Sequence, residues 1–260
     1  LVHSSRGATG VYGGVGNGLF LFRWRGVIPL LLLPALAMSL RETPHLDQML
    51  GEGLDTVWAW TSFAIALVGL GIRCYTIGHT PRGTSTRGTR HFRADQLNTT
   101  GVYSIVRNPL YLGNAVIALG LVLAVKVWWL AAIVALAGWL YLERIVAAEE
   151  EFLAERFGPE YARWVERTPA FIPRPSLWRP SDLSFSWRTV LRREYHGLLV
   201  ISASFFVIDA FTDLVIEGMP PDEWVRSDYI WSLILSLSLV VAAVLRVIKK
   251  HTRWLHERGR

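Results

Sequence analysis

The stretch Arg107-Asn108-Pro109-Leu110-Tyr111-Leu112-Gly113 opens an apolar run that continues to residue 142 and is interrupted by Lys126. One long helix over 109–142 is an alternative, but it would hold a lysine at its midpoint, which costs about 3 kcal/mol or more in lipid. Two short helices, 109–125 and 127–142, place the lysine at a turn instead. The sequence therefore predicts a tight membrane hairpin whose two polar ends return to the same side.

The composition extends this interpretation to the whole chain. Apolar residues make up 52% of the sequence and charged residues 18%, which is atypical of a soluble domain. A membrane-spanning helix needs roughly 20 mostly apolar residues. We expect an all-α, polytopic transmembrane helical bundle of about six spans, with a cytoplasmic amphipathic helix over 142–164. The segments that approach the required length are 20–40, 56–77, 109–125, 127–142, 195–217 and 229–248.

Basic residues are concentrated on one side of this arrangement. Of the 27 lysines and arginines, all but Arg41, Lys126 and Arg226 fall in the termini, in alternate loops or, for Arg73, at the same end of a span. By the positive-inside rule, this side is cytoplasmic. We therefore expect an integral membrane protein, in a bacterial inner membrane, with both termini in the cytoplasm. Anionic inner-leaflet lipids are the expected partners of the net charge of +6, which requires no nucleic acid.

The chain divides into three regions by composition. Residues 1–18 are rich in glycine and predict a flexible leader, residues 19–182 hold the motifs and form the expected core, and residues 183–260 predict a two-helix membrane extension. Asp209 and Asp213 lie four residues apart within that extension. Carboxylates inside a membrane are functional candidates, but a structural role, in which both pair with residues of neighbouring helices, is the favoured interpretation for these two.

The order of polar motifs resembles that of the isoprenylcysteine carboxyl methyltransferase and phospholipid methyltransferase superfamily. Its members carry Arg-His/Asn-Pro-x-Tyr-x-Gly, then Glu-Glu, Phe-Gly-x-x-Tyr and a late proline. Here the matching residues are Arg107 to Gly113, Glu149-Glu150, Phe157 to Tyr161, and Pro169 or Pro173, with Gly69-Leu70-Gly71 upstream. The resemblance implies a membrane methyltransferase that uses S-adenosylmethionine and a membrane lipid substrate.

The resemblance also assigns roles to individual residues. Expected cofactor-binding residues are Gly69, Gly71, Arg107, Pro109, Leu112, Gly113, Glu149 and Glu150, and expected catalytic residues are Arg107, Asn108, Tyr111 and Glu150. Expected substrate-binding residues are Arg90, Arg93, Tyr103 and Arg174, and no metal ligands are expected.

Elementary chemistry supports several of these roles. A proline fits the first turn of a helix, and such a helix start, beside an arginine, suits an anionic group. Carboxylates such as Glu149 and Glu150 can bind ribose hydroxyls, an ammonium or a sulfonium. Each piece also has a structural alternative: an interfacial anchor for Arg107, helix packing for Gly69-x-Gly71, and a solvated helix face for the glutamates.

Asn108 bears on the choice of substrate. The carboxyl methyltransferases usually have histidine at this place, and its loss removes the readiest general base. A phosphate or carboxylate is already ionised near neutral pH, whereas an amine must first lose a proton. This favours O-methylation of a lipid acid: a carboxylate or, by similarity to bacterial relatives with the run Leu97-Asn98-Thr99-Thr100-Gly101, a lipid phosphate such as that of lipid A.

Three other functions stay open at this point. They are phospholipid N-methylation, NADPH-dependent reduction of the kind carried out by membrane sterol reductases, and a non-catalytic role as a transporter or scaffold. The acceptor, its chain and the oligomeric state are not determined by the sequence.

Overall fold

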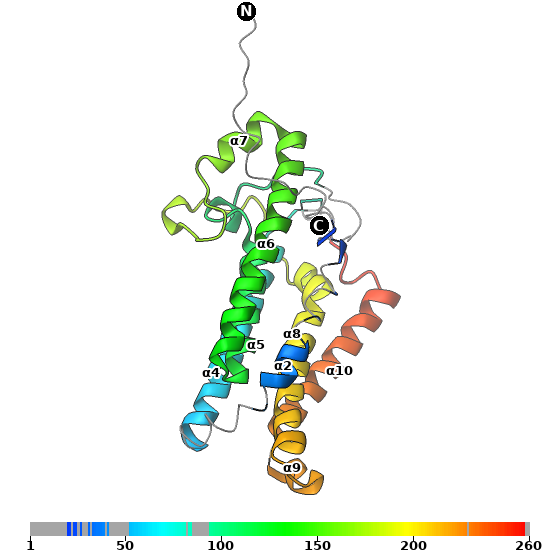
Figure 1. Cartoon of the computed structure of the whole chain (residues 1–260). Coiled ribbons are helices and arrows are strands. Elements are labelled where there is room, and N and C mark those ends of the chain that lie inside the picture. The colour runs from blue at the N-terminus through cyan, green and yellow to red at the C-terminus, as the bar shows by residue number, and fades with distance from the viewer. Residues whose placement is uncertain are drawn as a thin grey trace, which may run out of the picture.

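In the computed structural model, the described part of the chain is a bundle of long helices (Figure 1). It comprises residues 20–21, 23–24, 27, 31, 33–39, 41, 52–81, 83–84, 94–227 and 229–257. The helices within it are α2 (Leu33–Ser39), α4 (Glu52–Gly78), α5 (Pro109–Val125), α6 (Trp128–Phe157), α7 (Pro159–Val165), α8 (Trp187–Phe211), α9 (Pro221–Ser227) and α10 (Tyr229–His251). Short helical turns at η3 (Val102–Ser104), η4 (Pro175–Leu177) and η5 (Thr212–Ile216) complete them.

Four helical segments in the described ranges are long and apolar enough to cross a membrane: Gly53–Gly78, Trp128–Phe157, Trp187–Ile216 and Tyr229–His251. The shorter apolar helix α5 accompanies them. The predicted polytopic helical bundle is thus confirmed. The predicted leader, residues 1–18, lies outside the described residues. The first predicted span, 20–40, is described only in part, and its helix α2 has only seven residues.

The predicted hairpin is present. Lys126 ends α5 in the left-handed conformation, with φ 62°, and α6 begins two residues later. The Lys126 ammonium forms an ion pair with Asp55 near the start of α4. The turn therefore holds the lysine at the end of the hairpin rather than inside a helix, as the cost of a charge in lipid requires.

The predicted amphipathic helix over 142–164 is wrong as a separate element. α6 runs without interruption to Phe157, and Gly158, with φ +49°, separates it from α7. A helix of 30 residues is about 45 Å long, which exceeds the roughly 30 Å of a hydrocarbon core. The polar half of α6 therefore continues the span, and its apolar-to-polar change marks a membrane boundary rather than a helix boundary.

The core lies where α4, α5, α8 and α10 meet. Phe63 of α4 stacks edge-on to Phe205 of α8 at a centroid distance of 5.1 Å, and Phe205 stacks on Trp231 of α10 at 5.1 Å. Ala66 and Ile201 are fully enclosed beside these rings. Helices α8 and α10 of the predicted extension therefore pack on the same core as α4.

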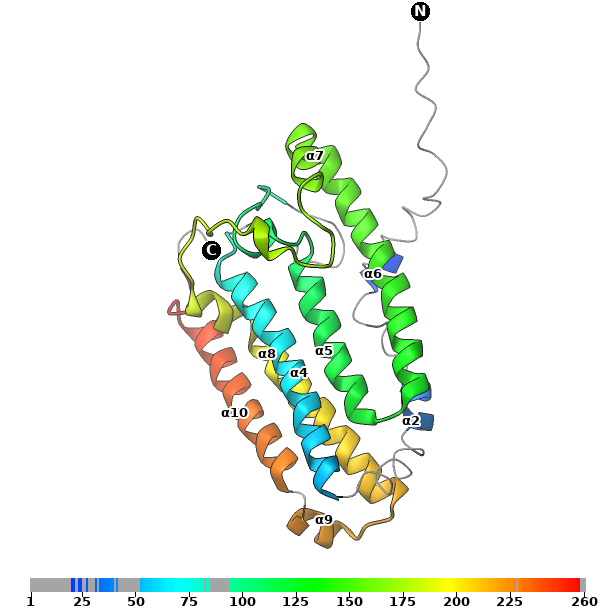
Figure 2. The ribbon, with the colours of Figure 1, turned by 90° about the vertical axis from the view of Figure 1, so that its left-hand side faces the viewer.

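Glycines allow α4 and α5 to approach closely. A Cβ atom on Gly69 would lie 2.6 Å from the backbone nitrogen of Ile117, and one on Gly120 would lie 2.6 Å from that of Ala66. Contacts between small residues are a common basis of helix association in membranes. Because α5 follows α4 closely, it diverges from α6 away from the Lys126 turn (Figure 2).

Candidate functional site

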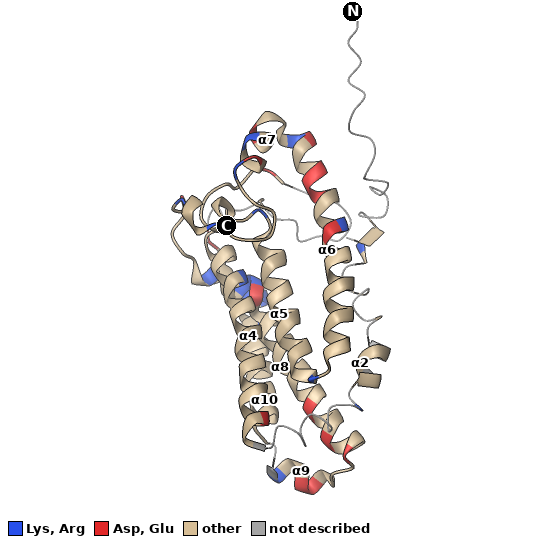
Figure 3. Cartoon of the chain, turned by 60° about the vertical axis from the view of Figure 1, so that its left-hand side comes forward, with Lys and Arg blue, Asp and Glu red and all other residues tan. Residues whose placement is uncertain are grey.

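A cavity of about 1390 Å³ lies between α5 and α6 and reaches α8 and α10. Its inner part is an apolar slot between the two hairpin helices, lined by residues such as Leu121, Val122, Ala131, Val134 and Ala135. Its other end is polar and lies toward α7, on the side where the charged residues of α6 lie (Figure 3). One cavity thus joins a polar site to an apolar one.

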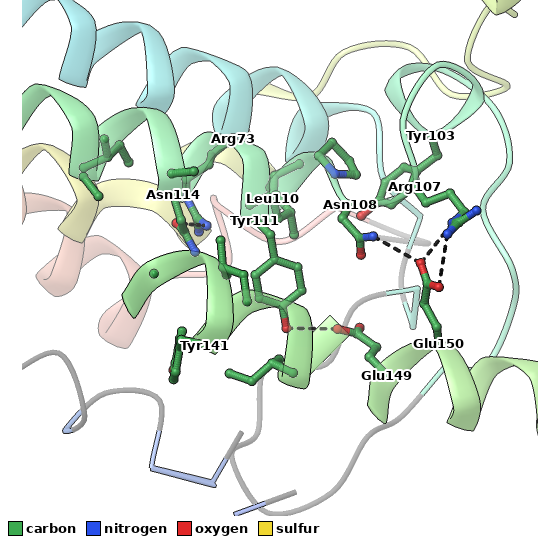
Figure 4. A pocket seen from close by; sticks show the side chains of 18 of the residues that line it. Arg73, Tyr103, Arg107, Asn108, Leu110, Tyr111, Asn114, Tyr141, Glu149 and Glu150 are labelled. Atoms are coloured by element: carbon green, nitrogen blue, oxygen red, sulfur yellow. Dashed lines mark hydrogen bonds and ion pairs between the residues drawn. The ribbon is translucent and has the colours of Figure 1, made fainter. Parts of the chain in front are cut away.

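Arg107 and Glu150 form the centre of the polar end. The Arg107 Nε and Nη2 donate to the Glu150 Oε1 and Oε2 at 2.9 and 3.1 Å (Figure 4). The Arg107 Nη1 donates to the carbonyl oxygens of Thr168, at 3.0 Å, and Val165, at 3.3 Å. Such two-point pairs are geometrically specific, so Arg107 ties the start of α5 to both α6 and the segment after α7.

Asn108 joins the same carboxylate. Its Nδ2 donates to the Glu150 Oε1 and to the carbonyl oxygen of Ala170, both at 3.3 Å. Asn108 immediately precedes α5, yet its side chain makes no capping hydrogen bond there. The amide therefore holds Glu150 in place and leaves the start of α5, with Pro109 at its first position, beside the cavity.

Glu149 is held differently from its neighbour. The Tyr111 hydroxyl donates to the Glu149 Oε2 at 3.0 Å (Figure 4), and both side chains line the cavity. Glu150 accepts from a cation and Glu149 from a neutral hydroxyl.

A second ion pair lies on the opposite wall. The Arg73 Nε and Nη2 donate to the Glu194 Oε2 and Oε1 at 2.8 and 2.9 Å, and the Arg73 Nη1 donates to the Asn114 Oδ1 at 2.8 Å. This pair connects α4, α5 and α8 across the cavity. Four further residues of α8 and α10 line the same wall: Arg192, Arg193, His196 and Lys249.

Tyr103 and Tyr161 lie at the polar end as buried phenols. Burial, followed by the charge of Glu149, raises the pKa of Tyr103, whereas Arg193 and Arg73 act in the opposite direction. Burial, followed by the charge of Glu150, raises the pKa of Tyr161. Both hydroxyls therefore remain neutral near physiological pH, and Tyr103 lies within electrostatic reach of both ion-pair clusters.

The structure brings together seven of the twelve predicted site residues that it describes. Arg107, Asn108, Pro109, Tyr111, Glu149, Glu150 and Tyr103 line the cavity. Gly69, Gly71, Leu112, Gly113 and Arg174 are not among the lining residues. Arg90 and Arg93 lie outside the described residues.

The three glycines that were predicted to bind the cofactor, Gly69, Gly71 and Gly113, do not line the cavity. Gly69 and Gly113 meet each other at the contact between α4 and α5, where a Cβ on Gly113 would lie 2.9 Å from the Gly69 carbonyl oxygen. Gly71 faces open space, with nothing within 4 Å of a Cβ placed there. The predicted convergence of Gly71 with Arg107 and Glu150 is therefore not observed in the cavity lining, and of the Gly-x-Gly motif only Gly69 packs against α5. Arg174 is exposed, and its backbone N–H donates to the Ile105 carbonyl oxygen at 2.9 Å.

Sequence reasoning missed the second ion pair. Arg73 was recognisable as a basic residue at the end of a span, and Glu194 as an acidic residue within the basic run Arg192-Arg193-Glu194. Their contact joins positions 121 residues apart, which no local pattern reveals. Trp164 was similarly unassigned; its indole N–H donates to the Tyr103 carbonyl oxygen at 3.0 Å.

A smaller cavity of about 200 Å³ lies near the opposite end of the bundle. Asp209 and Asp213 line it together with the ion-paired Asp55 and Lys126. Both aspartates have partners within the described structure. They belong to this second polar cluster and not to the large cavity.

The fold and the site together define a polytopic membrane protein in which a polar centre meets an apolar slot. The sequence profile of the phospholipid methyltransferase family matches residues 59–160, which run from α4 through α5 and α6 to the start of α7. The predicted relationship to the isoprenylcysteine carboxyl methyltransferase and phospholipid methyltransferase superfamily is confirmed for this part of the chain.

Two of the curated relatives are named as metal-resistance proteins, and a third is named as a methyltransferase. Over 121 residues the chain is 39% identical to a nickel-cobalt-cadmium resistance protein of Alcaligenes xylosoxydans xylosoxydans, which covers 46% of this chain and 55% of the relative. It is 36% identical to a cobalt-zinc-cadmium resistance protein of Cupriavidus metallidurans over 46% of this chain and 54% of the relative. The chain thus spans about half the length of these two curated relatives.

A third relative is a protein-S-isoprenylcysteine O-methyltransferase of Arabidopsis thaliana, 25% identical over 54% of this chain and 73% of the relative. No solved structure matches the chain. Within the described ranges, no group of three or more histidine, cysteine, aspartate or glutamate side chains is arranged to hold a metal ion.

Proposed function

We propose that this protein is an integral-membrane, S-adenosylmethionine-dependent methyltransferase that modifies a lipid-like acceptor. One observation carries the proposal: a single cavity joins the Arg107–Glu150 centre to an apolar slot between α5 and α6. Transfer between a water-soluble donor and a membrane-dissolved acceptor needs such a junction. The family match over residues 59–160 supports the same reaction class.

The polar end suits the chemical groups of S-adenosylmethionine. Glu149 supplies a negative charge for its ammonium or sulfonium, while Arg107 and the start of α5 supply positive potential for its carboxylate. When bound, the cofactor supplies an electrophilic methyl group: the carbon–sulfur bond breaks with its electron pair left on sulfur, and a bond to the acceptor oxygen forms. The residues of the chain position the reactants and exclude water.

Glu149 and Glu150 take separate roles in this proposal. Glu150 accepts hydrogen bonds from Arg107 and Asn108, so it is a positioning residue that fixes the start of α5. Glu149 accepts a hydrogen bond from the Tyr111 hydroxyl and lines the cavity, where its carboxylate would be a ligand for the cationic cofactor. Tyr111 would orient the Glu149 carboxylate toward the cofactor.

The acceptor would be an acidic lipid group, such as a phosphate of the lipid A kind or a carboxylate. Such an oxygen is already ionised and transfers no proton, which fits a site with Asn108 in the place of a histidine. The α7 end would face the cytoplasm of a bacterial cell, because the positive-inside rule places the basic loops there.

Cofactor binding distinguishes this proposal from its alternatives. Calorimetry on the purified protein in detergent should show binding of S-adenosylmethionine and none of NADPH. A reductase would bind NADPH instead, and a transporter or scaffold would bind neither cofactor. Glu149→Gln should weaken binding, and the exposed Glu151→Gln, one position along, serves as the control.

Product analysis then identifies the acceptor. Membrane lipids from cells with and without the protein should differ by one methyl mass on an acidic headgroup. A methylated amine headgroup would establish N-methylation instead. The absence of S-adenosylmethionine binding by the folded wild-type protein would overturn the proposed function.

A further inference from the structure

We propose that α8 and α10 form the binding site for the anionic headgroup of the acceptor lipid. Both helices lie beyond residues 59–160, the part that the family profile matches. Three of their cationic side chains, Arg192, Arg193 and Lys249, line the large cavity. The inference rests on the proposed function in so far as the bound lipid is the methyl acceptor.

The charge of the cavity favours an anionic ligand. Five cationic side chains (Arg73, Arg107, Arg192, Arg193 and Lys249) and three carboxylates (Glu149, Glu150 and Glu194) are among its described lining residues. Arg107 is paired with Glu150 and Arg73 with Glu194. By element, the lining residues of α8 and α10 (Arg192, Arg193, Lys249 and Glu194) sum to a charge of +2, and the other four sum to zero. The excess of positive charge therefore belongs to the α8 and α10 wall, where an ionised phosphate or carboxylate would be stabilised.

Tyr103 shows that this wall adjoins the methyl-transfer centre. Tyr103 lines the same cavity as Glu149, Arg193 and Arg73, and the charge of Glu149 raises the pKa of its phenol while those of Arg193 and Arg73 lower it. The Glu149 carboxylate, in turn, accepts a hydrogen bond from the Tyr111 hydroxyl at the polar end. A headgroup held by Arg193 would lie beside the groups assigned to the methyl donor.

The apolar part of the cavity identifies the ligand as a lipid. The same cavity continues between α5 and α6 along Val122 and Val134, which suits an aliphatic chain and not a free anion. The chemistry shared by the possible ligands is an ionised oxygen acid attached to a hydrocarbon chain. Its oxygen donates an electron pair to the methyl carbon, and one negative charge of the headgroup is lost without transfer of a proton.

Basic residues near a cytoplasmic membrane surface also attract anionic lipids without a specific site. Basic residues of α8 and α10 that lie outside the cavity serve as a control for this non-specific attraction. Arg188, Arg246 and Lys250 lie on the same two helices, are exposed, and are not among the lining residues of the cavity. Replacing them removes the same charge from the surface and leaves the cavity wall intact.

The test compares two triple variants of the full chain in neutral detergent: Arg192→Gln/Arg193→Gln/Lys249→Gln for the wall, and Arg188→Gln/Arg246→Gln/Lys250→Gln for the surface. The probe is phosphatidic acid, with phosphatidylcholine and inorganic phosphate as separate arms. We expect the wall variant to bind phosphatidic acid at least about tenfold more weakly than wild type. The surface variant should stay within about twofold of wild type.

Each outcome has a distinct meaning. Equal losses in both variants, or stronger binding of phosphatidylcholine than of phosphatidic acid, would overturn the headgroup site. Inorganic phosphate binding as tightly as phosphatidic acid would overturn the lipid as its ligand. S-adenosylmethionine affinity is measured in parallel: its retention by the wall variant shows that the fold is intact, and its absence in wild type would refute the proposed function separately. If the wall variant does not fold, the single variants Arg193→Gln and Lys249→Gln supply the same comparison.

Discussion

Arg107 and Glu150 meet through two hydrogen bonds of 2.9 and 3.1 Å although 43 positions separate them in the chain. One residue precedes the hairpin and the other lies on its returning helix. The contact therefore closes the polar end of the space between α5 and α6, while the Lys126 turn closes the other end.

Arg107→Lys should destabilise the protein although the substitution keeps the positive charge. A lysine cannot reproduce the two-point contact with Glu150 while also bonding the carbonyl of Thr168. We expect a loss of about 2 kcal/mol in the free energy of unfolding, seen as a lower midpoint of thermal unfolding in detergent. Arg163→Lys, at an exposed site on α7, is the control. An unchanged midpoint in Arg107→Lys would contradict a structural role for the pair.

Substitutions of Glu149 and Glu150 should have different effects on cofactor binding and on stability. Glu149→Gln removes the negative charge of a side chain that lines the cavity but leaves an oxygen that can still accept from the Tyr111 hydroxyl, so it should weaken S-adenosylmethionine binding by about tenfold with little change in stability. Glu150→Gln should lower the midpoint of thermal unfolding because it leaves Arg107 partly buried without its partner. Calorimetry and thermal unfolding on both variants give the comparison. Equal loss of stability in the two would show that the carboxylates act as one unit.

Substitution of the glycines distinguishes packing from cofactor binding. Gly69→Ala places a Cβ against the α5 backbone at 2.6–2.7 Å, so we expect a destabilisation of about 1–3 kcal/mol. Gly71→Ala meets open space and should raise helix stability by up to about 1 kcal/mol. Thermal unfolding measures both. A loss of S-adenosylmethionine affinity in a stable Gly71→Ala variant would restore the cofactor role that the sequence predicted for this glycine.

Gly138 offers a way to narrow the slot without disturbing its walls. It lines the cavity on α6, and a Cβ placed there meets nothing within 4 Å. Gly138→Leu should therefore increase the KM for a long-chain acceptor by about tenfold and leave S-adenosylmethionine binding unchanged. Gly71→Leu, which faces away from the cavity, is the matched control. Unaltered acceptor kinetics in Gly138→Leu would exclude this slot as the chain-binding site.

Tyr161 should limit stability at alkaline pH. Its pKa in the folded protein is raised by burial and by the charge of Glu150, whereas a tyrosine in the unfolded chain ionises near pH 10. The stabilisation linked to the neutral phenol is fully present below about pH 10 and is lost as the pH rises further. The fall in thermal stability above that pH should be smaller in Tyr161→Phe than in wild type. An equal loss of thermal stability in Tyr161→Phe and wild type would contradict the raised pKa of Tyr161.

The hairpin and the helix start at Pro109 were predictable because their causes are local. A lysine between two apolar runs has one inexpensive position, at a turn, and Pro109 fits a helix start in any context. The superfamily resemblance placed Arg107 and Glu150 together. The boundary of α6 was not predictable in this way, since a change from apolar to polar residues reports the environment of a helix and not its end.

The remaining differences arise from contacts between distant segments. Two glycines one residue apart fit either a ligand or a neighbouring helix, and only the position of α5 shows that Gly69 meets a helix. The Arg73–Glu194 pair depends on how α8 packs against α4. No periodicity within either helix encodes that packing.

The closure of the hairpin at both ends has a consequence for how molecules arrive. Leu119 and Trp139 line the cavity and are 51% and 59% exposed, so the opening between α5 and α6 is directed sideways, into the plane of the bilayer. A hydrocarbon tail can then pass between the helices without ever entering water. The rate at which such a lipid meets the protein would depend on its abundance in the membrane and on its two-dimensional diffusion. Its insolubility in water would not slow its entry into the cavity.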